Sequence, residues 1–155
     1  MTLKKNTSLP DTDHILRHVS WSKLRKDEND NVIGINGDAF KLREATKSGK
    51  PETSLSANHI ECYPGTTHND KVISAIQDAR NVIMVKPKAG FAVCNVGCMK
   101  FFCREKKVKI HIVSDPTEHN KTHVAVKSIP ADDDDLLDLL ASEDCSRLVL
   151  NNSVP

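Results

Sequence analysis

Two short runs in which apolar and polar residues alternate, at residues 108–113 and 122–127, constrain the fold of this chain most strongly. In each run, valine or isoleucine alternates with lysine or histidine. A period of two is typical of a strand with one buried face. The segment between the runs carries an Asp-Pro pair, which predicts a hairpin loop. The two runs therefore predict neighbouring antiparallel strands.

The register of these strands predicts that two histidines face each other. If Ile110 pairs with Val124, both apolar rows lie on one side and His111 lies opposite His123 on the other. A shift by two residues makes the histidines diagonal neighbours. A shift by one residue turns the apolar row outward and is excluded.

Other apolar patterns predict further strands and two main helices. Residues 67–80 combine helical spacing with a capping-box pattern at Thr67 and Asp70. A second helix is expected after Pro130, where four aspartates precede a leucine-rich run whose spacing Leu148 continues about two turns later. Further strands are expected within 15–26 (where a helix over 16–24 fits as well), 32–42, 82–86 and 91–96. We expect an α+β fold whose mostly antiparallel sheet carries both helices on one face.

The length of 155 residues suits a single domain. We expect residues 14–150 to form that domain, residues 1–13 to form a flexible tail, and residues 151–155 to fray. The 22 basic and 21 acidic residues give a net charge of +1, which argues against a large basic nucleic-acid surface but allows a local patch.

Cellular location is predicted from segments that the sequence lacks and from its cysteines. No run approaches the roughly 20 apolar residues of a membrane helix, and no signal-peptide pattern is visible. We therefore expect no contact with membranes. The five irregularly spaced cysteines indicate reduced thiols and a cytoplasmic protein.

Three cysteines, Cys94, Cys98 and Cys103, raise the question of a zinc site. Their spacing differs from the paired cysteines of structural zinc sites. A fourth ligand would have to come from Cys62, His111 or Cys145. The simpler interpretation is packing, because a free cysteine behaves as a small apolar residue. We expect no metal and no cofactor.

Residues 53–63 form the stretch where a functional site is most strongly indicated. They combine hydroxyls, an amide, an imidazole, a carboxylate and a thiol, between a loop with glycine and proline and a Pro-Gly turn. Ser56 and Asn58 are suited to orient a ligand by hydrogen bonds, and Glu61 is suited to act as a base.

Histidine acid–base chemistry is the leading functional hypothesis. Metal-free cleavage of an RNA phosphodiester needs one neutral and one protonated imidazole, and a cation to hold the phosphate. A group-transfer enzyme with a nucleotide co-substrate would use similar residues, so both remain open. The predicted catalytic residues are His18, Glu61 and His123. The predicted substrate-binding residues are Arg17, Lys23, Ser56, Asn58 and His111.

The competing hypothesis is a non-catalytic accessory or interaction module. Its partner surface would be the acidic, leucine-rich helix from Asp132 to Leu140, where Leu139 or Leu140 exceeds what the core needs. Geometry separates the two hypotheses. An enzyme needs its catalytic residues to converge on a cleft, whereas an interaction module needs an exposed apolar patch.

The chain also resembles a group of short bacterial proteins that carry no assigned activity. The shared features are an Arg-His pair near the start, a turn rich in Asp and Asn, a block reading LSxNxxE and a late histidine. The resemblance spans residues 17–140. In that group a tryptophan stands where this chain has His59, which makes His59 a weaker candidate for a shared function. The resemblance implies that these residues belong together: Arg17, His18, Ser56, Glu61 and His123.

Overall fold

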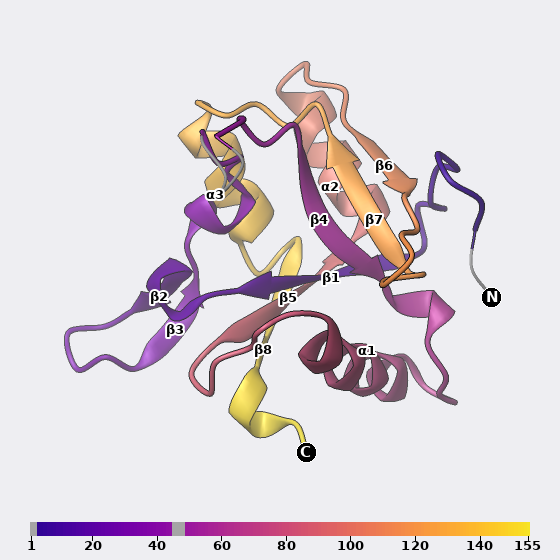
Figure 1. The fold of residues 1–155 in the computed structure, drawn as a ribbon. Helices are drawn as coiled ribbons and strands as arrows, with labels where there is room; N and C mark the ends of the chain where they lie inside the picture. The colour runs from indigo at the N-terminus through magenta and orange to yellow at the C-terminus, as the bar shows by residue number, and fades with distance from the viewer. Residues whose placement is uncertain (1–2, 45–48) are drawn as a thin grey trace.

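The computed structural model describes residues 3–44 and 49–155, which form a six-stranded antiparallel sheet with α-helices on both faces (Figure 1). The strand order is β6-β7-β4-β1-β5-β8. The strands are β1 His14–Val19, β4 Ser54–His59, β5 Gly90–Asn95, β6 His111–Ser114, β7 His123–Lys127 and β8 Ser146–Leu150. A separate hairpin joins β2 Leu24–Lys26 to β3 Val32–Ile35. The α+β prediction with a mostly antiparallel sheet is confirmed.

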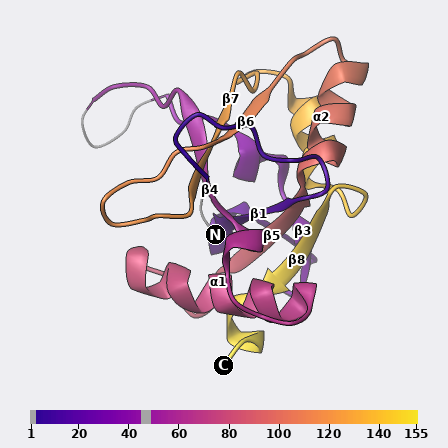
Figure 2. The same cartoon turned by 90° about the vertical axis from the view of Figure 1, so that its right-hand side faces the viewer.

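Helix α1 (His68–Val82) covers one face of the sheet, and helices α2 (Val96–Glu105) and α3 (Asp134–Ala141) cover the opposite face (Figures 1 and 2). Ile15 packs in the larger core with the leucines of α3, whereas the next residue, Leu16, packs with α1 in the smaller core. The prediction that both main helices share one face is therefore wrong. Central strand β1 is apolar on both sides, so each side needs a cover.

The N-terminal segment is not the loose tail that was expected. Residues 6–9 run beside β6, where the backbone N–H of Leu9 donates to the carbonyl of Ile112 at 3.0 Å, and the carbonyls of Asp11 and Asp13 accept from the first residues of α2. The Leu9 side chain is buried in the larger core. Residues 1–2 of the predicted tail lie outside the described residues.

The C-terminal segment is also ordered rather than frayed. Val154 is buried in the smaller core. The Arg80 guanidinium of α1 donates to the carbonyls of Asn151 and Val154, each at 2.9 Å. These bonds fasten the end of the chain to α1.

The predicted register of the last hairpin is wrong. The expected partner of Ile112 was residue 122, but Ile112 pairs with Val126, a slip of four residues. His111 consequently lies opposite Lys127, not opposite His123. Because the slip is even, both apolar rows still face one side, so alternation alone cannot detect it.

The capping box of α1 was predicted and is present. Thr67 accepts from the N–H of Asp70 at 3.1 Å, and the Asp70 carboxylate accepts from the N–H of Thr67 at 3.3 Å. These bonds satisfy donors that the first turn leaves without partners.

Replacing Thr67 with alanine is expected to lower the free energy of unfolding by about 0.5–2 kcal/mol, because the N-cap acceptor is lost. Urea denaturation followed by circular dichroism measures this change. Thr66→Ala is the matched control, since Thr66 is exposed and has no capping role. An equal loss in both variants would contradict the assignment.

Candidate functional site

The candidate site is a cavity at the place where β1 and β4 separate. Strand β1 pairs with β5 along its whole length, but its ladder with β4 contains only Ile15 with His59 and Leu16 with Asn58. Beyond these pairs a cavity of about 560 Å³ is lined by both strands, by the end of α1 and by the loop before β7.

This cavity brings together most of the residues predicted from the sequence. Those that line it are Arg17, His18, Lys23, Ser56, Asn58 and His123. Glu61 and His111 lie elsewhere, so their assignment to the same site is wrong. Glu61 belongs to the 3-10 turn Ile60–Cys62, which directs its carboxylate to His14. The register slip moves His111 to a different depression at the edge of the sheet.

Arg17 carries positive charge into the wall of the cavity. Its Nε donates to the carbonyl of Ala39 at 2.7 Å and its Nη1 to the carbonyl of Ser56 at 2.8 Å. Among the described residues no carboxylate forms an ion pair with it within 4.0 Å. Burial lowers the pKa of Arg17, and the charge of Glu52 partly opposes this effect. A guanidinium held only by neutral carbonyls favours an anionic ligand.

The other charged side chains in the lining do not neutralise the charge of Arg17. Lys23 and Arg43 add two further cations to the lining. The carboxylate of Glu52 is the acidic group in the lining, and it is bound by Arg43 at 3.1 Å. The lining therefore carries an excess of positive charge that attracts phosphate groups.

His18 lies against the edge of Phe91, with ring centroids 5.7 Å apart. Its Nε2 is buried and has no hydrogen-bond partner among the residues that the structure describes. Burial lowers the pKa of His18, and neighbouring Arg17 lowers it further. The imidazole is therefore neutral near pH 7 and suited to accept a proton.

His123 is held in one orientation by Asp115. Its Nδ1 lies 2.9 Å from the backbone carbonyl oxygen of Asp115 and 3.3 Å from the carboxylate. A carbonyl oxygen only accepts, so Nδ1 carries a hydrogen in either charge state. Nε2 is then the nitrogen that can exchange a proton with a ligand.

The two histidines project from the same face of the sheet. Asn58 pairs with Leu16 on one side and with His123 on the other, and His18 lies two residues beyond Leu16. Regular strand spacing and rise set a lower bound of roughly 12 Å between the two backbone positions, and the separation of β1 from β4 beyond Leu16 adds to it. Side chains that enter one cavity from this separation can contact opposite sides of a phosphate group.

Apolar residues on the rim of the cavity were not predicted to belong to the site. Val82 ends α1 and is followed by Ile83 and Met84; all three are exposed, Met84 by 83%. Their apolar sequence favoured a strand over residues 82–86, but α1 extends to Val82 and a loop follows. This rim lies at the same cavity as buried Phe91 and offers a surface for a flat apolar group.

The cysteines do not form a metal site with one another. Cys94, Cys103 and Cys145 are buried in the larger core, and no cysteine belongs to a metal-compatible group within the described ranges. Burial raises the pKa of Cys94 and Cys103 to about 11 each. These thiols are therefore protonated and serve in packing.

The leucines of the acidic helix α3, which was expected to bind a partner, pack mostly inside the protein. Leu136, Leu137 and Leu140 are buried in the larger core, and Leu139 is half-buried. The apolar side of α3 is thus already covered by the fold.

No described helix is long and apolar enough to cross a membrane.

Comparison of the chain with protein-family models, with curated proteins and with solved structures finds no match. The function is therefore inferred from the geometry and chemistry of the cavity.

Proposed function

We propose that this protein binds RNA or a nucleotide in the cavity between β1 and β4, and that His18 and His123 transfer protons at a phosphate ester. The observation that carries this proposal is one cavity lined by three cationic side chains and three histidines, of which His18 and His123 lie in different environments. We place this activity in the cytoplasm, because the cysteines are present as thiols, which persist there.

The lining of the cavity offers groups for both parts of a nucleotide. The phosphate is assigned to Arg17 and Lys23, neither of which forms an ion pair within 4.0 Å with a carboxylate of the described residues. The base is assigned to the apolar rim at Ile83 and Met84, beside Phe91. Stacking of a base on an apolar or aromatic surface tolerates different sequences.

The proposed reaction is cleavage of RNA by its own 2′-hydroxyl. Neutral His18 removes the proton from the 2′-oxygen, which attacks phosphorus and forms a new P–O bond. Protonated His123 gives its Nε2 proton to the 5′-oxygen as the P–O5′ bond breaks. The products are a 2′,3′-cyclic phosphate and a 5′-hydroxyl, and Arg17 stabilises the charge that develops on the phosphoryl oxygens.

Incubation of the protein with a single-stranded RNA oligonucleotide in the presence of a chelator tests this function. We expect fragments that end in a 2′,3′-cyclic phosphate, identified by mass spectrometry. A DNA oligonucleotide of the same sequence lacks the 2′-hydroxyl and should bind without being cleaved. Binding of RNA without cleavage would remove the catalytic part, and absence of RNA and nucleotide binding would overturn the proposal.

A further inference from the structure

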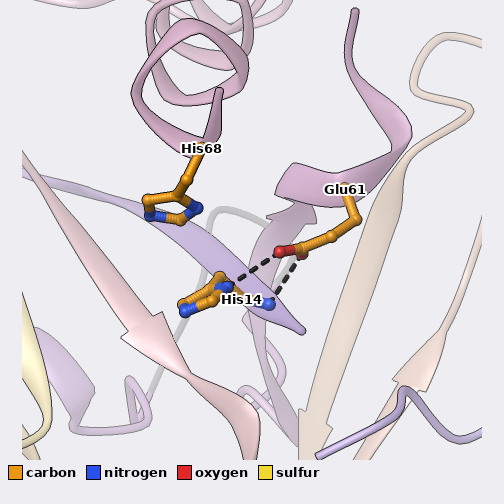
Figure 3. A group of neighbouring side chains, drawn as sticks. All are labelled: His14, Glu61 and His68. Atoms are coloured by element: carbon orange, nitrogen blue, oxygen red, sulfur yellow. Dashed lines mark hydrogen bonds and ion pairs between the residues drawn. The ribbon is translucent and has the colours of Figure 1, made fainter. Parts of the chain in front are cut away.

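A second group of ligand-type side chains lies where three elements meet, away from the cavity. His14 begins β1, Glu61 lies in the 3-10 turn after β4, and His68 is the first residue of α1 (Figure 3). One ligand atom from each of the three lies within 4.8 Å of the other two. Figure 3 shows both imidazoles and the carboxylate directed toward one another.

Short contacts hold this group together. The Glu61 carboxylate accepts from the backbone N–H of His14 at 2.7 Å, and its other oxygen lies 2.8 Å from His14 Nδ1. The rings of His14 and His68 have centroids 4.4 Å apart and are tilted by 50°. Two imidazoles and a carboxylate at this separation form a ligand set that divalent transition metals use in proteins.

The loop between Glu61 and His68 folds back so that the two side chains lie close together. Gly65 has a φ of +151°, and a Cβ at this position would lie 2.7 Å from the Cβ of Asp70. Only glycine allows the loop to pass so close to the first turn of α1. This close passage returns the chain so that His68 faces the turn that carries Glu61.

His59 and Asp13 lie beside Glu61 but do not belong to the proposed ion site. His59 is buried, and its Nε2 lies 2.7 Å from the carboxylate of Asp13 and 3.9 Å from that of Glu61. Its Nδ1 lies 3.2 Å from the sulfur of Cys62. Both ring nitrogens of His59 are therefore engaged inside the protein.

We propose that His14, Glu61 and His68 bind one divalent transition-metal ion, with Zn²⁺ as the representative ion. The two imidazole nitrogens favour such an ion over Mg²⁺ or Ca²⁺, which prefer oxygen ligands. His68 is exposed, and the side chains of His14 and Glu61 are 28% and 26% exposed, so an ion can reach the group.

Between His14 and Glu61, little rearrangement is needed to admit the ion. Zinc–nitrogen and zinc–oxygen bonds of about 2.0–2.2 Å at tetrahedral angles separate two ligand atoms by roughly 3.4 Å. The contact between His14 Nδ1 and Glu61 is 2.8 Å, so it must open by only a fraction of an ångström. The Nδ1 proton leaves to solvent and the ion takes its place, which ties β1, the 3-10 turn and α1 together.

This site is separate from the cavity of the proposed function. His14 and His18 lie four residues apart on β1, which corresponds to about 13 Å along a strand. The metal proposal therefore stands or falls independently of RNA cleavage in the presence of a chelator.

Calorimetric titration of the full chain with Zn²⁺, after treatment with a chelator and desalting, tests this site. We expect one tight site per chain and a higher melting temperature with Zn²⁺. His68→Ala and Glu61→Gln should each weaken Zn²⁺ binding by about tenfold or more, since even changes behind the direct ligands cost that much. His68→Ala is the decisive variant, because this exposed side chain can be removed without disturbing the core.

Two matched variants guard against binding at other imidazoles and thiols. His111→Ala removes an exposed histidine on β6, and Cys98→Ser removes a half-exposed thiol. Both should bind Zn²⁺ as the unmodified protein does. Unchanged affinity in His68→Ala, or an equal loss in either control, would overturn the proposal.

Discussion

Replacing His123 with alanine is expected to lower the rate of RNA cleavage by roughly 10²–10⁴-fold, the usual contribution of a positioned acid or base. The ring is held by Asp115 with its Nδ1 as a donor, so Nε2 is the proton source for the leaving oxygen. Without it the 5′-oxygen must leave as an unprotonated alkoxide. Single-turnover kinetics with a fluorescent RNA oligonucleotide measures the change.

The pH dependence of the same reaction identifies the partner of His123. Burial, followed by the charge of Arg17, lowers the pKa of His18 below its ordinary value of 6.5. Only the neutral form of His18 accepts a proton, so activity should rise as pH increases through this lowered pKa. The ascending limb is thus expected below pH 6.5, and His18→Gln should lower the rate and remove that limb.

A matched control variant distinguishes the loss of a catalytic imidazole from the loss of any histidine. His111→Ala removes an exposed imidazole from β6, outside the cavity, and should retain full activity. Thermal unfolding of each variant shows whether it is folded. Full activity in a folded His123→Ala protein would end the catalytic assignment and leave the cavity as a binding site alone.

Local signals in the sequence were sufficient for some elements and not for others. The capping box and helical spacing predicted α1 because both signals lie within the helix itself. Helix α2 was missed because no polar linker precedes it: Asn95 ends β5 and also caps α2 by accepting from the N–H of Cys98 at 2.9 Å. The cysteines of this segment were considered as zinc ligands or as packing residues. The buried helical face that includes Met99 and Cys103 was therefore not recognised.

Strand β8 was missed for a related reason. Leu148 continues the leucine spacing of the preceding helix, so the helix was expected to extend toward the C-terminus. The structure ends α3 at Ala141, and Leu148 pairs with Ala92 of β5 instead. Pairing with a strand more than fifty residues earlier leaves no signal in the local pattern.

The cavity contains some of the residues named from the sequence, but its shape was not predicted. The acid–base reasoning and the resemblance both selected His18 and His123, which line the same cavity. The cavity itself arises because β1 and β4 separate after two residue pairs, which no pattern of side chains shows. Glu61 lies outside the cavity because the chain leaves β4 in a 3-10 turn that directs the carboxylate to His14.

Replacing Arg17 with methionine is expected to weaken binding of a nucleotide or RNA by about 2–5 kcal/mol, the cost of removing one partner from a desolvated charge pair. This corresponds to roughly 30-fold to several thousand-fold in the dissociation constant. The reason is that Arg17 is held by the carbonyls of Ala39 and Ser56, which orient the guanidinium without neutralising it. Fluorescence anisotropy with a labelled RNA oligonucleotide measures the change.

Two further variants distinguish this site from non-specific attraction. Arg25→Met removes an exposed arginine of β2 outside the cavity, and should change affinity little. Arg17→Lys keeps the charge but cannot reproduce the forked geometry of the guanidinium, so its affinity should fall between those of the unmodified protein and Arg17→Met. Equal losses in Arg25→Met and Arg17→Met would indicate attraction to overall charge and contradict a phosphate site at Arg17.

The effect on folding should differ from the effect on binding. Methionine removes a charge that burial already disfavours, as the lowered pKa of Arg17 indicates, while the two carbonyls can turn to water in the cavity. Replacing a desolvated charge with an apolar side chain of similar length is often neutral for stability. We therefore expect Arg17→Met to lose its ligand while its urea midpoint stays close to that of the unmodified protein. A large loss of stability with unchanged affinity would make Arg17 a structural bridge between β1 and β4 rather than a ligand for phosphate.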